Sequence, residues 1–245
     1  MLYRQYENFE QAYLELNQEI LRNPSLIEYL NTTMGGIDQV IIQTTSKECG
    51  NLNLGALGYK INKWDHLVKT YLGPDKIEEL KHLGENISGL SAGFDFLRKT
   101  THNGACMREI IISREKRKKP WDTLTVVWRT TELQRRWMAD LILISRMAEL
   151  IPNTNFTKFN LVLTTCYQSA MYIIPILKPV FNIDTSELDP KNPYTKVIIT
   201  REAKYYKPDK HEHSLLASGE RLVELYKDYE KGFIPPKITY KECKL

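Results

Sequence analysis

Two short apolar stretches, followed at once by a longer one, do most to restrict what this chain can fold into. Residues 110–113 and 124–128 are rich in β-branched and aromatic side chains and are joined by a short basic loop, so they predict two neighbouring strands. Residues 137–150 are apolar over the length of a helix and predict a buried helix. A strand pair that leads directly into a helix, without strict alternation of strands and helices, is typical of an α+β protein.

The remaining patterns extend this interpretation along the chain. Helices are predicted at residues 9–21, 75–83 and 214–229, and strands at residues 40–42, 54–59, 159–165 and 197–200. The sequence contains no internal repeat and no linker-like segment. We therefore expect a single domain over residues 1–245, built on one large mixed sheet flanked by helices.

Composition excludes several classes of protein. A net charge of +4 is far below that of a dedicated DNA-binding chain, although it is compatible with a phosphate-bearing substrate. The four cysteines show no CxxC spacing, so we expect neither a zinc site, nor any other metal, nor a disulfide framework. No apolar stretch has the length of a membrane span, and the N-terminus does not resemble a signal peptide. These observations predict an intracellular, cytoplasmic protein, in the host cytoplasm if the source is viral.

Cys106 is the candidate nucleophile because of its neighbours in the sequence. It opens the first of the two predicted strands, with Arg108 beside it and Arg129 at the end of the second strand. Nearby arginines favour the thiolate form, which is the reactive form of cysteine. The competing interpretation is a buried structural thiol, because free cysteines are among the most buried residues.

The residues after the second strand resemble the thymidylate synthase and deoxycytidylate hydroxymethylase superfamily. That family has a strand ending in Q-R-S-x-D, then an Asn or Asp on the following helix, then H-x-Y. Its pattern can be laid on residues 129–172 without a gap, and after a slightly longer loop Cys106 falls on the family's nucleophile. The matching residues are Arg129, Thr130, Glu132, Asp140 and Tyr172. The resemblance covers most of the chain and implies a thymidylate-synthase-like fold that forms a homodimer by packing sheet against sheet.

The resemblance also implies a reaction. In this family a cysteine thiolate adds to C6 of a pyrimidine nucleotide, and C5 then takes a one-carbon unit from 5,10-methylenetetrahydrofolate. It implies catalytic roles for Cys106, Glu132 and Asp140, substrate contacts for Arg129, Thr130, Asp140, Tyr172 and Arg108, and cofactor contacts for Trp137 and Glu132. A carboxylate at Asp140 accepts a hydrogen bond from the cytosine amine, so cytosine is favoured over uracil.

Some family positions differ in this chain. The paired arginines that reach the partner's phosphate site fall on Asn86 and Ile87, and the histidine of H-x-Y falls on Ala170. A glycine near the folate falls on Arg136, which counts against folate use. These differences favour two alternatives, namely an enzyme that hypermodifies a pyrimidine already in DNA, as in bacteriophages, and a non-catalytic relative that keeps the fold for binding.

A basic loop bears on the DNA alternative. Its cationic residues suit contact with a nucleic acid backbone, although such a loop is more often a solvated hairpin tip. The residues expected to make this contact are Arg114, Lys116, Arg117, Lys118 and Lys119. The other candidate residues have simple structural interpretations too. Arg129 and Glu132 would pair at a strand end, Asp140 would complement a helix dipole, and a tyrosine such as Tyr172 often lies at the edge of a core.

Overall fold

The computed structural model of the chain describes residues 2–29, 32–85, 89–96, 106–115, 120–201, 224–228, 231–232 and 237–245. Within this part, seven strands form one sheet: β1 (Leu2–Tyr6), β2 (Ser25–Tyr29), β3 (Thr32–Thr44), β4 (Ser91–Asp95), β5 (Met107–Ser113), β6 (Trp121–Glu132) and β7 (Thr154–Ser169). The α-helices are α1 (Phe9–Arg22), α2 (Ile61–Tyr71), α3 (Gly73–Leu83), α4 (Arg136–Leu150), α5 (Ala170–Ile173), α6 (Leu177–Phe181) and α7 (Pro193–Arg201), with short 3-10 helices η1 (Leu54–Leu57), η2 (Ile174–Ile176) and η3 (Thr185–Glu187).

The sheet is mixed, as the sequence predicts. Its strand order is β1-β3-β7-β6-β5-β4, with β2 paired to β3. The pairs β1/β3 and β6/β7 are parallel, and the other pairs are antiparallel. The predicted pairing of the strands at residues 110–113 and 124–128 is confirmed by the register of β5 with β6. The fold is therefore α+β, with one large sheet flanked by helices.

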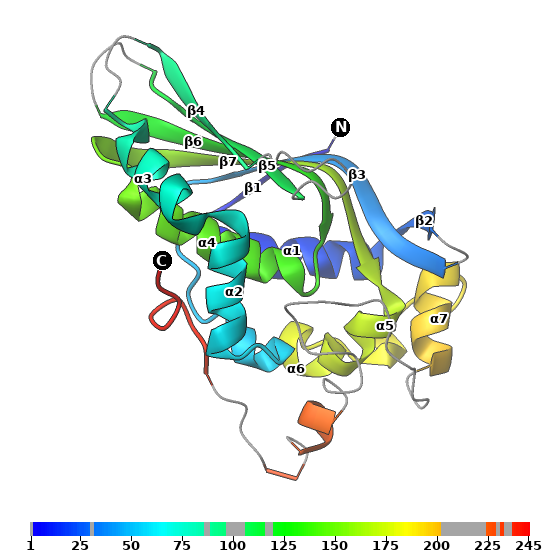
Figure 1. The fold of residues 1–245 in the computed structure, drawn as a ribbon. Helices are drawn as coiled ribbons and strands as arrows, with labels where there is room; N and C mark the ends of the chain where they lie inside the picture. The colour runs from blue at the N-terminus through cyan, green and yellow to red at the C-terminus, as the bar shows by residue number, and fades with distance from the viewer. Residues whose placement is uncertain are drawn as a thin grey trace.

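The labelled helices lie on one side of the sheet (Figure 1). The face toward them carries apolar side chains such as Val126, Trp128 and Leu161, which are fully buried. Helix α1 begins at Asn8, whose side chain accepts a hydrogen bond from the Gln11 amide at 2.8 Å. The same helix buries its predicted apolar stripe, and each such side chain stabilises the fold by about 1.5–3 kcal/mol.

The opposite face of the sheet carries polar side chains. Hydrogen bonds join Gln5 to Gln43 at 3.3 Å, Gln43 to Asn160 at 3.0 Å, and Asn160 to Thr125 at 3.3 Å. These residues lie side by side on β1, β3, β7 and β6. The same face also carries the half-buried apolar side chains of Ile41, Val162 and Val127, so it is mixed in polarity.

Two predicted strands are wrong. Residues 54–57 form the 3-10 helix η1, because Asn53 caps its start and Gly58, with a φ of 77°, ends it in the left-handed conformation. Residues 197–200 lie in α7, where Tyr194 and Ile198, one turn apart, are both fully buried. Tertiary packing there outweighs the β-propensity of the branched side chains.

The helices at residues 9–21, 75–83 and 137–150 are confirmed, and α2 has no counterpart in the predictions from sequence. Of the helix predicted at residues 214–229, the structure describes only residues 224–228, which are helical. Among the described residues, no helix is both long enough and apolar enough to cross a membrane.

Candidate functional site

The ends of three elements meet around Cys106. The residue lies just before β5, and its carbonyl oxygen accepts a hydrogen bond from the Arg129 amide of β6 at 2.9 Å. Next to it in the register, Met107 pairs with Trp128. Strand β6 then turns into α4, whose second turn carries Asp140. This local geometry brings a thiol, a guanidinium and a carboxyl group from distant parts of the sequence into one region.

Asp140 is buried and accepts a hydrogen bond from the indole Nε1 of Trp128 at 3.2 Å. Burial raises the pKa of the Asp140 carboxyl to about 7, although the Trp128 hydrogen bond and the charge of Arg136 act in the opposite direction. Asp140 therefore changes its charge near neutral pH, which is unusual for an aspartate.

Cys106 is half-buried. Burial raises the pKa of its thiol, and the negative charge of Asp140 raises it further, whereas Arg136 and Arg129 lower it. Arg129 thus acts in the expected direction but is outweighed, so the thiol is protonated in the resting protein. Cys106 and Asp140 therefore interact electrostatically. Arg129 and Arg136 are both exposed.

Glu132 is held by a buried ion pair. The Arg135 guanidinium donates to both of its carboxylate oxygens, at 2.6 and 2.8 Å, and Arg136 lies 3.6 Å away. Burial alone would raise the pKa of Glu132, but Arg135 lowers it overall, so this carboxylate stays ionised at neutral pH. The same Arg135 guanidinium lies 3.2 Å from the centre of the Tyr172 ring. Glu132, Arg135 and Tyr172 therefore form one buried stack at the edge of the cluster.

The structure adds three tyrosines to this region that the sequence did not indicate. Burial raises the pKa of Tyr59 and Tyr71 well above the usual value, and the charge of Asp140 raises both further. Tyr167, which pairs with Glu132 across β6 and β7, has a pKa of about 12 for the same reason of burial. All three are uncharged donors and acceptors at neutral pH. No motif marked them, because Tyr59 lies in a predicted strand and Tyr71 ends an unpredicted helix.

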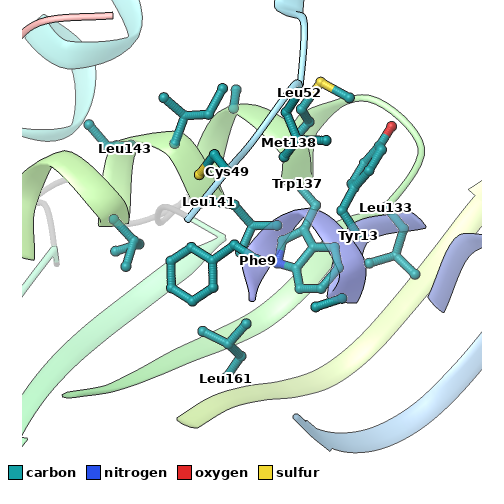
Figure 2. Close-up of a cluster of buried hydrophobic side chains, with 14 of the residues drawn as sticks. Phe9, Tyr13, Cys49, Leu52, Leu133, Trp137, Met138, Leu141, Leu143 and Leu161 are labelled. Carbon is teal, nitrogen blue, oxygen red and sulfur yellow. The ribbon is translucent and has the colours of Figure 1, made fainter. Parts of the chain in front are cut away.

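The other predicted substrate contacts occupy different environments. Thr130 is half-buried on β6 opposite Thr165 of β7, and Arg108 is half-buried on β5. Trp137 does not have the accessible surface that a cofactor contact needs. It is fully buried in the core beside Tyr13, with ring centres 6.4 Å apart (Figure 2). Trp137 lies in the first turn of α4 and its side chain is directed toward α1, so it packs in the core instead of contacting a cofactor.

The predicted nucleic-acid surface is only partly described. Arg114 is buried, with its guanidinium 4.7 Å from the centre of the Trp121 ring and a hydrogen bond to the carbonyl oxygen of Gly89. A residue packed in this way does not present its charge to a polymer. Lys116, Arg117, Lys118 and Lys119 lie outside the described residues, as do Asn86 and Ile87. In the described part of the chain, no cluster of three metal-ligating side chains occurs.

No protein-family model matches this sequence, and no curated protein is significantly similar to it. The fold and the cluster around Cys106 define an α+β protein with a thiol, a carboxyl group that titrates near neutrality, and two exposed arginines at the end of one mixed sheet.

Proposed function

We propose that this chain is a thymidylate-synthase-like transferase that modifies C5 of a pyrimidine deoxynucleotide, with cytosine favoured over uracil. The observation that carries the proposal is geometric: Cys106 is joined to Arg129 by a 2.9 Å backbone hydrogen bond, and the neighbouring Trp128 donates to the buried Asp140 carboxyl at 3.2 Å. A nucleophile, a group that reads a base and a cation for phosphate are the parts that such a reaction requires.

The chemistry begins with covalent addition. Cys106 loses its proton and its sulfur forms a bond to C6 of the base, while the electrons of the C5–C6 double bond shift to C5 and the 4-position oxygen or nitrogen. C5 then takes a proton from water or bonds to an electrophilic carbon; its original hydrogen leaves to water as a proton, and those electrons restore the C5–C6 double bond as the sulfur departs as thiolate. Arg129 binds the phosphate with Thr130, and Tyr172 accepts or donates at the sugar hydroxyl.

Asp140 reads the base through a hydrogen-bond pair. Its pKa of about 7 means that part of the protein carries a neutral Asp140 carboxyl group near neutral pH, and in that form one oxygen donates and the other accepts. A cytosine presents N3 as an acceptor and its amine as a donor, so the neutral form satisfies both atoms. The position of Asp140 in the same cluster as the thiol supports this role.

The residues present do not fit a folate donor. Trp137, which the resemblance assigns to the cofactor, is in the core, and Glu132 is engaged by Arg135 on both oxygens. The poor fit to folate keeps the modification of a pyrimidine in DNA as an alternative function. However, Arg114, one of the residues expected to contact DNA, is buried.

A homodimer is part of the proposal. The helices of the described residues leave one face of the sheet uncovered (Figure 1), and that face carries the row of hydrogen-bonded side chains from Gln5 to Thr125. Asn160→Arg would place a charge in the middle of this row. We expect the wild type to sediment as a dimer and this variant as a monomer, and a monomeric wild type would refute the dimer alone.

Exchange of the C5 hydrogen tests the function without any carbon donor. We expect dCMP labelled with tritium at C5 to release tritium into water in the presence of the protein, and Cys106→Ser to abolish release. Cys49→Ser is the matched control, because Cys49 is buried away from the cluster. Absence of release from both dCMP and dUMP, in a protein that is folded by circular dichroism, would refute the proposed function.

A further inference from the structure

We infer that Trp128 is a specificity-determining residue, because its indole N–H fixes which oxygen of Asp140 accepts and which donates, and so decides between cytosine and uracil. This inference rests on the proposed function and deepens it. Trp128 is fully buried on β6, and its Nε1 lies 3.2 Å from Oδ2 of Asp140.

An indole N–H can only donate a hydrogen bond. The Asp140 oxygen that it contacts, Oδ2, must therefore act as an acceptor. When the carboxyl group is protonated, the carbonyl oxygen is the better acceptor, so the proton resides on Oδ1. Trp128 thus gives a symmetric group a fixed direction, with a donor at Oδ1 and an acceptor at Oδ2.

That direction matters because the two pyrimidines present opposite patterns. Cytosine has an acceptor at N3 and a donor at position 4, whereas uracil has a donor at N3 and an acceptor at position 4. A neutral carboxyl group that is free to move its proton between its oxygens pairs equally well with either base. One with a fixed direction pairs with one base and leaves two buried polar atoms of the other unpaired.

The surroundings of Asp140 support the neutral form near pH 7. The charged or ionisable groups that interact with it are Arg136 on its own helix, Cys106 before β5, Tyr59 after η1 and Tyr71 at the end of α2. Both tyrosines and the thiol have raised pKa values and are uncharged at neutral pH, so only Arg136 is permanently charged among them. Trp128 itself does not titrate, so it fixes the direction of the Asp140 carboxyl group whenever that group carries its proton, and the direction is lost when Asp140 ionises.

The inference is tested by measuring dCMP and dUMP binding to the wild type and to the variants Trp128→Phe, Trp121→Phe and Asp140→Asn. The wild type should bind dCMP about tenfold or more tightly than dUMP, since an unpaired buried edge costs at least that factor. Trp128→Phe should reduce the ratio to within about threefold of unity. Trp121→Phe is the matched control, because it removes another fully buried indole N–H, 3.1 Å from the Gly84 carbonyl, and should keep the wild-type ratio.

Asp140→Asn keeps a donor and an acceptor at position 140 but removes the ionisable group, so it separates the effect of hydrogen-bond direction from the effect of charge. Because the Trp128 N–H requires an oxygen at the Oδ2 position, the amide nitrogen must take the place of Oδ1 and donate there. We therefore expect Asp140→Asn to keep the wild-type preference and to lose the change in binding around pH 7. A reversal of preference to the other base in this variant would overturn the inference.

A second measurement needs no nucleotide. Carbon-13 NMR of labelled aspartate should show that the titration midpoint of Asp140 rises in Trp128→Phe and is unchanged in Trp121→Phe. An unmoved midpoint in Trp128→Phe, or an unchanged preference in that variant while the wild type discriminates, overturns the role of Trp128 and leaves the proposed function standing. A wild type that binds neither nucleotide refutes the proposed function instead, and the preference assigned to Trp128 with it.

Discussion

Replacement of Arg135 by methionine tests whether the buried stack is a structural support of the cluster. Arg135 is fully buried and Glu132 is 5% exposed, and two hydrogen bonds of 2.6 and 2.8 Å join them. Removal of one partner from a buried pair destabilises a protein by about 3–5 kcal/mol, because the other charge stays buried without compensation. Loss of the contact with the Tyr172 ring adds to this, whereas Arg136, 3.6 Å from Glu132, recovers part of it. We expect Arg135→Met to lose about 3 kcal/mol of unfolding free energy.

The loss should depend on pH in a defined direction. Without Arg135, burial is left to raise the folded pKa of Glu132 above its unfolded value of about 4.3. The destabilisation is then fully present above the folded pKa and is relieved as the pH falls and Glu132 takes up a proton. Urea unfolding followed by circular dichroism at pH 7.5 and pH 5 measures both effects.

Two further variants complete this test. Glu132→Gln combined with Arg135→Met removes the charge and should recover stability relative to the single variant. Lys81→Met breaks an exposed pair with Glu78 at the same sequence spacing and should leave the urea midpoint unchanged. If Arg135→Met lost less than about 1 kcal/mol, or lost the same amount at both pH values, the reasoning about the buried pair would be refuted.

Three other outcomes follow from the burial and pKa directions. In the native protein, iodoacetamide should label Cys106 and leave the other three cysteines unlabelled until urea unfolds the chain, and mass spectrometry of labelled peptides that shows another site first would contradict this order. Asp140→Asn should speed the alkylation of Cys106 at pH 8, because it removes a charge that raises the thiol pKa; an unchanged rate would contradict the electrostatic interaction. Glu149, whose pKa is lowered to about 2 by Lys47, Tyr240 and Arg146 against the effect of burial, should stabilise the fold above about pH 4.3 and lose this effect as the pH falls toward 2, so Glu149→Gln should flatten that part of an acid unfolding curve.

Hydrophobic patterns predicted most of the central sheet and its two main helices. The stripe in α1 has the period of a helix, whereas the apolar run in α4 was assigned to a helix by its length, and both are buried as expected. Residues 54–57 and 197–200 were misassigned for a common reason. Their apolar or β-branched side chains fit either state, and the choice was made by Asn53 and Gly58 at one site and by the packing of Tyr194 at the other.

The candidate site was less accessible to sequence reasoning. The sequence predicted Cys106 at the start of one strand and Arg129 at the end of the next; the structure has Cys106 just before β5, hydrogen-bonded to Arg129 of β6, and β6 continues to Glu132. Spacing did not reveal that Arg135 holds Glu132, since either of two adjacent arginines satisfies the same pattern. It also assigned Trp137 to a cofactor, because an aromatic side chain at a helix start serves a core and a ligand equally well.

The raised pKa of Cys106 constrains how the proposed reaction begins. A nucleophilic thiol must lose its proton, yet in the resting protein both burial and the charge of Asp140 oppose that loss. A base that pairs with the neutral form of Asp140 removes one of these two obstacles, because it keeps the carboxyl group uncharged. By linkage, binding of the correct base and formation of the thiolate then favour each other. Under the proposed function, a base of the wrong pattern would leave Asp140 free to ionise, so the group proposed to read the base would also control when the Cys106 sulfur becomes reactive.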